Sequence, residues 1–289
     1  MSFIEAIINF FSGAIFRDAI MADLNRMYIT GTPMMQSAIS DVGMTPQAWN
    51  GAVFSLIQNL SQTVILPIAG VILTFVVTYE LITIVMEKNN MADFDTFNIY
   101  KWIIKTFIAI FILTNTWSIV IGIFDLAQQV VSNSSGLMLD SEIMNTSLLA
   151  EFEAQIADME FFQLLGLWFQ VQIAGLLMNI LAIAIMAVVW GRMIEIYLIT
   201  SIAPIPLATI TNREYGQMGN NYLKNLFAVA FQGFLIMVCI GIHMAMSSTL
   251  LVGATDASVS LWQMVGTTVI LVFMLFKTGS IAKSIFGAH

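Results

Sequence analysis

Long apolar stretches, separated by shorter polar ones, dominate the pattern of this chain. A helix of about 20 apolar residues crosses the ~30 Å hydrocarbon core of a bilayer, because each residue adds about 1.5 Å. Five stretches approach or exceed this length: residues 64–86, 102–124, 162–190, 226–246 and 259–276. The pattern therefore predicts an all-α, polytopic membrane protein with five transmembrane helices.

A proline-broken stretch, residues 190–215, follows the third predicted span. It carries Arg192 and Glu195, and then the run Ala203-Pro204-Ile205-Pro206. Proline lacks a backbone N–H and clashes with the preceding turn, so a helix that reaches this run ends there. A helix from Met193 to Ala203 would rise only about 16 Å, roughly half of the hydrocarbon core. Two interpretations remain: a re-entrant or interfacial segment beside five spans, or six transmembrane helices, one of them broken by the prolines.

The N-terminal segment, residues 1–63, is predicted to be external and amphipathic. Its first 28 residues combine a short apolar stripe with charged positions, which favours a helix on the membrane surface over a short spanning helix. Gly31-Thr32-Pro33 predicts a turn, and Gly43-Met44-Thr45-Pro46 predicts another. Thr45 and Pro46 then fit the N-cap and the first position of a new helix.

The stretch at residues 125–161 is acidic and contains no lysine or arginine. Apolar residues recur within it at roughly helical spacing: Leu139, Ile143, Leu148, Leu149, Phe152, Ile156 and Met159. This spacing predicts an external acidic loop that carries an amphipathic helix. Residues 64–124 then form the first two transmembrane helices. Residues 162–289 form the remaining bundle, with the proline-broken segment and a cytoplasmic tail.

The placement of basic residues predicts the orientation, because cytoplasmic loops collect lysine and arginine. Lys88 and Lys101 place the connection between the first two spans in the cytoplasm and the acidic loop outside. If the proline-broken stretch does not cross, the basic residues after the third span are all cytoplasmic: Arg192, Arg213, Lys224, Lys277 and Lys283. The N-terminus is then outside and the C-terminus inside, in a multi-pass protein of the cytoplasmic membrane.

Composition and the absence of known motifs exclude several classes of function. The chain is 58% hydrophobic and 10% charged, against about 25% charged for a soluble domain. Its net charge of −8 argues against binding nucleic acid through a basic surface. We find no phosphate-binding loop, H-E-x-x-H, G-x-S-x-G or Cys/His cluster. The sequence therefore predicts no enzyme, no catalytic or metal-binding residue and no cofactor.

Ionisable residues inside a membrane are rare and need a partner or water. Glu80 and Lys105 fall at similar depth in adjacent spans, either as an ion pair that lines a pathway or as side chains that reach the interface separately. Arg192 and Glu195, three residues apart on one helical face, are expected to form a local salt bridge. Pro204 and Pro206 complete the candidate pathway and structural residues. Several amides in the third span are expected to bond between helices or line a wet cavity: Gln163, Gln170, Gln172 and Asn179.

The order of spans and the run G-R-M-I-E-I-Y-L-I-T-S-I-A-P-I-P-L-A resemble the TrbL-like family. These proteins are polytopic inner-membrane subunits of conjugative type IV secretion systems, here in the compact form found in Gram-positive mobile elements. The resemblance covers residues 64–286 and rests chiefly on Arg192, Glu195 and the run Ala203-Pro204-Ile205-Pro206.

The resemblance implies a non-enzymatic channel or scaffold subunit that forms a homo-oligomer in the lipid bilayer. Its implied partners are other type IV secretion subunits and their ATPases, with transient contact to the translocating DNA–protein substrate. The acidic loop lacks basic residues, so a scaffolding role fits it better than phosphate binding. The alternative function is a stand-alone secondary transporter or ion channel, for which a broken helix is also typical.

Overall fold

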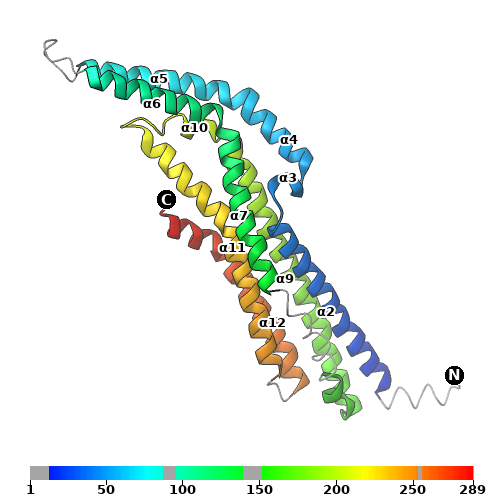
Figure 1. Ribbon diagram of the computed structural model, residues 1–289. Coiled ribbons are helices and arrows are strands. Elements are labelled where there is room, and N and C mark those ends of the chain that lie inside the picture. Colours follow the sequence, from blue (N-terminus) through cyan, green and yellow to red (C-terminus); the bar gives the residue numbers. More distant parts are fainter. Residues whose placement is uncertain (1–12, 87–95, 139–151, 253–255, 289) are drawn as a thin grey trace. The chain divides into compact units, whose positions relative to one another are not determined.

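The computed structural model describes residues 13–86, 96–138, 152–252 and 256–288, and this part of the chain contains helices and turns but no strand. Figure 1 labels these elements, which run in the order α2 (Ala14–Val42), α3 (Pro46–Trp49), α4 (Gly51–Leu60), a π-helical turn η1 (Ser61–Ile65), α5 (Leu66–Met86), α6 (Thr96–Thr114), α7 (Thr116–Met138), α9 (Phe161–Ser201), α10 (Pro204–Leu207), α11 (Gly216–Val252) and α12 (Ala257–Phe286). Residues 152–157 add a short helix before α9.

Five helices in the described residues are long and apolar enough to cross a membrane: Gly51–Met86, Phe97–Thr114, Phe161–Ser201, Gly216–Met246 and Ala257–Phe286. This confirms the all-α class and the prediction of five apolar spans. The chain is a multi-pass membrane protein.

The helices form two compact units, and each unit takes three separate pieces of the chain. The first unit consists of Met1–Gly43, Val131–Trp190 and Phe234–Thr278, of which residues 13–43, 131–138, 152–190, 234–252 and 256–278 are described. The second unit consists of Met44–Val130, Gly191–Gly233 and Gly279–His289. Helix α9 therefore contributes its first 30 residues to the first unit and its last turns to the second.

In the first unit, α2 lies beside α9 (Figure 1). Ile20, Leu24 and Met27 follow helical spacing on α2, and they pack with α9 residues such as Leu164 and Val171. The same cluster includes Phe152 and Ile156, and Met159 packs against it. Three of the apolar residues predicted for the amphipathic helix of the acidic stretch are thus on the packed side, while Leu139, Ile143, Leu148 and Leu149 lie outside the described residues.

In the second unit, α5 and α6 form an antiparallel hairpin (Figure 1). Ala69 and Leu73 of α5 meet Ala109 and Leu113 of α6, and small residues at this contact let the two backbones approach. Trp102 Nε1 donates to the carbonyl oxygen of Val77 at 3.1 Å and fixes the register further along the hairpin.

The helix start predicted at Thr45 and Pro46 is confirmed. Thr45 Oγ1 accepts from the Ala48 N–H at 3.2 Å, and Pro46 occupies the first turn. This helix, α3, is only four residues long. Asn50 caps α4 in the same way, through the Val53 N–H at 3.1 Å.

The turn predicted at Gly31-Thr32-Pro33 is wrong, because α2 runs through it without interruption. Packing explains the difference. Met27 is buried in one core cluster of the first unit and Val42 in another, so both sides of the predicted turn are held in helical register. Tertiary packing of this kind overrides local propensity. The apolar stripe predicted within the first 28 residues lies mostly before residue 13, outside the described residues.

The second span differs from its prediction at residues 102–124, because α6 ends at Thr114 and α7 begins at Thr116. The side chains of Thr114, Asn115 and Thr116 all donate back to carbonyl oxygens of α6, at 2.8–3.0 Å. Such bonds compete with the regular helical pattern and mark a boundary. Helix α7 then continues to Met138, so the first part of the stretch predicted as an acidic loop is helical.

Candidate functional site

The predicted break at the prolines is confirmed. Helix α9 includes the third predicted span together with Arg192 and Glu195, and it ends at Ser201. We call residues 202–215, between α9 and α11, the proline turn. Residues 193–201 form no separate half-helix, because nothing between Trp190 and Ser201 breaks a helix.

Backbone hydrogen bonds shift from the α to the tighter i→i−3 pattern at the prolines. The Ala203 N–H donates to the Thr200 carbonyl at 3.3 Å, and the Ile205 N–H to the Ile202 carbonyl at 3.1 Å. This leaves the Ile199 carbonyl without its usual helical donor, and the Tyr222 hydroxyl donates to it at 3.0 Å from α11. The end of α9 is therefore stabilised, because a side chain from the next helix replaces the lost backbone hydrogen bond.

The rest of the proline turn is equally closed. Asn212 is buried, and its Oδ1 accepts from the Glu214 and Tyr215 N–H groups at 2.8 and 2.9 Å. A Cβ at Gly219 would lie 2.7 Å from the Pro206 carbonyl oxygen, so only glycine allows α11 to pass this close to the turn. The proline turn is thus a packed part of the protein.

The proline turn contacts two neighbours within the second unit. Ala208 is buried in the cluster of the α5–α6 hairpin, and Ile205 packs against it. Ala203 and Leu207 belong to the cluster that includes Leu226 and Val229 of α11. The proline turn therefore packs against both the hairpin and α11.

Arg192 is 5% exposed, and its guanidinium enters α11 rather than solvent. Nε donates to the Val229 carbonyl at 3.4 Å, and Nη2 to the Ala230 carbonyl at 3.3 Å. A Cβ at Gly233 would lie 2.6 Å from Nη2, so the space that holds the guanidinium exists because residue 233 is glycine. Nη1 is buried and has no hydrogen-bond partner among the described residues.

The predicted local salt bridge between Arg192 and Glu195 is wrong. Glu195 pairs with Lys283 of α12 at 3.1 Å, and Arg192 forms no ion pair among the described residues. The reason is that each side chain finds a partner on a different neighbouring helix: Arg192 donates to carbonyls of α11, and Glu195 accepts from a lysine of α12.

Glu80 and Lys105 form the ion pair that one of the two interpretations requires. Lys105 Nζ lies 2.6 Å from Glu80 Oε1 across the α5–α6 hairpin. The side chain of Glu80 is 14% exposed and that of Lys105 is 35% exposed. Whether the pair lines a pathway stays a prediction.

Four residues that hold this region together were not predicted from the sequence as site residues: Gly233, Tyr197, Tyr222 and Lys283. The Tyr197 hydroxyl donates to the Pro46 carbonyl at 2.6 Å and ties α9 to α3. Tyrosines in apolar helices are a usable signal, because a buried hydroxyl needs a partner. Gly233 offers no such signal in the sequence, since its role depends on Arg192, which is 41 positions away.

The amides predicted to bond between helices do so at two positions. Gln170 Oε1 accepts from Trp262 Nε1 at 3.0 Å and from the Ser258 hydroxyl, both on α12. Gln172 Nε2 donates to Asp23 Oδ2 on α2.

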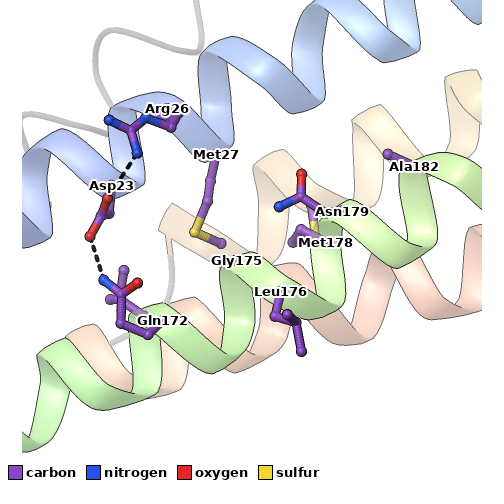
Figure 2. Close-up of a pocket in the computed structure, with 10 residues that line it drawn as sticks. Asp23, Arg26, Met27, Gln172, Gly175, Leu176, Met178, Asn179 and Ala182 are labelled. Atoms are coloured by element: carbon purple, nitrogen blue, oxygen red, sulfur yellow. Dashed lines mark hydrogen bonds and ion pairs between the residues drawn. The ribbon is translucent and has the colours of Figure 1, made fainter.

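A cavity of about 320 Å³ lies between α2 and α9 in the first unit (Figure 2). Asp23 and Arg26 of α2 and Gln172 and Asn179 of α9 supply its polar lining. Figure 2 shows Asp23 between Arg26 and Gln172. Asp23 forms an ion pair with Arg26, at 3.6 Å, and accepts a hydrogen bond from Gln172. The described residues contain no group of three or more metal-binding side chains.

Comparison with known proteins identifies one family. The sequence model of the TrbL/VirB6 plasmid conjugal transfer like proteins matches residues 33–204, more than half of the chain. No curated protein and no solved structure matches. The match contains Glu80, Lys105, Arg192 and Glu195 and ends within the proline turn, at Pro204. The chain belongs to the TrbL/VirB6 plasmid conjugal transfer-like family, and it is a membrane subunit of conjugation machinery.

Proposed function

We propose that this protein is a channel or scaffold subunit of a conjugative type IV secretion machine, in the compact form of Gram-positive mobile elements. It helps a DNA–protein substrate cross the cytoplasmic membrane and performs no chemistry of its own. The observation that carries the proposal is the family match over residues 33–204, which includes the first three candidate spans.

The proposed orientation has the N-terminus outside and the C-terminus in the cytoplasm. Lys277 and Lys283 at the end of the chain and Arg213 in the proline turn support it, because basic residues collect on the cytoplasmic side. On that side the subunit meets the ATPases that supply energy. The protein acts as a homo-oligomer together with other secretion subunits.

In the proposed mechanism the proline turn is the joint between the α5–α6 hairpin and α11. Many of its backbone donors and acceptors are paired inside the protein, which supports a broken helix at membrane depth. Glu80 and Lys105 lie on the hairpin side of this joint, and Arg192 and Glu195 on the α9 side.

The test is conjugative transfer from a donor that lacks this chain, complemented by the wild type or by Pro204→Ala/Pro206→Ala. Alanine favours a continuous helix by about 3 kcal/mol per site relative to proline, so we expect transfer to fall sharply. Ile202→Ala is the matched control, because Ile202 lies in the same turn and is 49% exposed. Its transfer should equal that of the wild type.

Undiminished transfer from donors that lack the chain would refute the conjugative function. Undiminished transfer by a stably inserted double-alanine variant would refute only the role of the proline turn.

The second candidate function is a stand-alone transporter or ion channel. The observation that favours it is the discontinuous helix α9–α10, a feature of transporter binding sites. Solute or ion flux in vesicles that contain only this protein would support it, and flux equal to that of empty vesicles would exclude it.

A further inference from the structure

Helix α2 is the least apolar of the long helices in the first unit, and it is absent from the five candidate spans. It carries Arg17, Asp18, Asp23, Arg26 and Asp41. The sequence places no charged residue between Arg26 and Asp41. With 29 residues, α2 is about 43 Å long, which exceeds the thickness of the hydrocarbon core.

Helix α2 runs parallel to α9 at a constant sequence offset. Gln172 bonds to Asp23, and Trp190 Nε1 donates to Asp41 Oδ2 at 3.2 Å; both pairs are separated by 149 residues. The two contacts lie about 27 Å apart along the helices, close to the thickness of the hydrocarbon core. Between them, α9 has Asn179 as its one residue with a polar functional group. The middle of α2 therefore lies against the most apolar part of α9.

Both halves of α2 also pack against other candidate spans of the same unit. Leu24 shares a core cluster with Leu261 and Val265 near the start of α12. Val42 is fully buried in a cluster with Ile236 of α11 and Leu271 of α12. A helix lying along the membrane surface would contact these spans at one level only. Helix α2 contacts them at two levels, so it extends through the membrane with them.

The outward faces of α2 and α9 differ in chemistry. On α2 the exposed described residues include Asp18, Asn25, Arg26, Ser37 and Ser40, and Ile15 is its one exposed large apolar residue there. The exposed large apolar residues of α9 in the same unit are Phe162, Phe169, Ile173, Leu176, Ile180, Ile183, Met186 and Trp190. Burying an arginine in lipid costs about 2.5–3.5 kcal/mol at the helix centre, whereas apolar side chains are favoured there.

We propose that α2 crosses the membrane parallel to α9 and that its outward polar face lies in water while the outward face of α9 lies in lipid. The inference deepens the proposed function and rests on it only for the identity of the substrate that moves along this face. In the secretion subunit the polar face of α2 borders the translocation path.

The parallel arrangement restricts the rest of the topology. If α2 and α9 cross in the same direction, the chain between Val42 and Phe161 crosses an odd number of times. The apolar pattern predicts two spans there, residues 64–86 and 102–124. Helix α7 makes no separate return crossing after α6, because Asn115 alone joins the two helices and helical backbone bonds continue across it. The number of crossings is therefore odd only if one of these two predicted spans does not cross. The predicted sides of the two termini are unchanged, whereas the chain that directly follows α2, predicted to be external, becomes cytoplasmic. The connection between α5 and α6 keeps its predicted cytoplasmic side when the second of these spans is the one that crosses.

The first test locates the two ends of α2 in the full-length protein, with Cys239 replaced by alanine. Single cysteines at Ile15 and Ser40, both exposed, are treated with a membrane-impermeant maleimide in intact cells and in inverted vesicles. We expect Ile15→Cys to react only from outside and Ser40→Cys only from the cytoplasmic side. Reaction of both from one side would overturn the proposal.

The second test compares the two outward faces at equal depth. Ser37→Cys is matched with Met186→Cys, because these positions also differ by 149 residues and both side chains are exposed. The thiolate is the form that attacks a thiol reagent, and it forms readily in water and not in lipid, so we expect Ser37→Cys to react ~10-fold faster or more with a charged reagent. Equal rates at the two positions would overturn the proposal.

These labelling results are independent of conjugation. Transfer is measured for the same variants, so a failure of the α2 topology with normal transfer is distinguishable from a failure of the secretion function with the labelling pattern intact.

Discussion

Arg192 and the Glu80–Lys105 pair place charge in apolar helices in two different ways. Arg192 is buried and bonds to backbone carbonyls of α11 in a space that Gly233 leaves free. Glu80 and Lys105 neutralise each other through side chains that remain partly exposed. The first arrangement depends on the backbone of a neighbouring helix, and the second depends only on two flexible side chains.

The difference teaches where substitution is tolerated. A guanidinium held by a rigid backbone cannot move when its surroundings change, and a buried charge that loses its partners costs about 3–5 kcal/mol. Lys105 can instead reach toward polar surroundings when its partner is removed, because its long stem is flexible. The two sites therefore predict effects of different size.

The largest effect is expected from Gly233→Val. The new side chain would occupy the position of the guanidinium and displace it from both carbonyls, which lowers the free energy of unfolding by about 3–5 kcal/mol. Thermal unfolding of the detergent-solubilised protein measures this loss. Gly266→Val in α12 is the matched control, because a Cβ at Gly266 would meet no atom within 4 Å. The comparison fails if the two valine variants are equally stable.

A double substitution sharpens this result. Gly233→Ala combined with Arg192→Ala should be no less stable than Arg192→Ala alone, because the atom that the new methyl group would meet is gone. Additive losses in the double variant would show that Gly233 has a role other than making space for Arg192.

Arg192→Lys is expected to have the next largest effect. An ammonium is a single point of donation on a flexible stem and cannot reach two carbonyls in a fixed fork. We expect a loss of about 1–3 kcal/mol, the usual effect of an unmade hydrogen bond to a charged group. The same unfolding measurement tests it, and full stability in the lysine variant would mean that the fork geometry is unimportant.

A smaller effect is expected from Glu80→Gln, at about 1 kcal/mol, because the Lys105 ammonium can move toward a polar region. The charge-exchanged variant Glu80→Lys/Lys105→Glu should recover most of this loss. Protein level in the membrane and unfolding temperature report both variants. The single variants Glu80→Lys and Lys105→Glu are the comparison. If the exchanged variant is as unstable as either of them, the pair contributes through the surroundings of each side chain and not through mutual attraction.

The smallest effect is expected from Lys283→Met. Lys283 and Glu195 are 43% and 36% exposed, and pairs of this exposure contribute about 0–1 kcal/mol. Unfolding temperature and transfer frequency should both stay near the wild-type values. A loss of stability as large as that of Arg192→Lys would show that Glu195, like Arg192, depends strongly on its partner.

The sequence was sufficient for features that local chemistry determines. Apolar length identified the five candidate spans, the proline run located the end of α9, and Thr45 with Pro46 located the start of α3. Each of these depends on residues that are close together in the chain.

The features that could not be predicted depend on distant residues. Arg192 and Glu195 are neighbours in sequence, yet each bonds to a different helix 37 or more residues away. Helix α2 continues through Gly31 because Met27 and Val42 are packed against other segments. A single sequence does not contain the distances between such segments.

The constant offset between α2 and α9 links the lengths of two segments that evolve separately. One extra residue between Asp23 and Asp41 would shift one of the two contacts with α9 by about 1.5 Å and rotate it by about 100°. An insertion in α2 is therefore compatible with both contacts only when α9 gains a residue between Gln172 and Trp190. Relatives that operate in thicker or thinner membranes should change the two helices together, so that the two contacts keep one common sequence offset, which is 149 here.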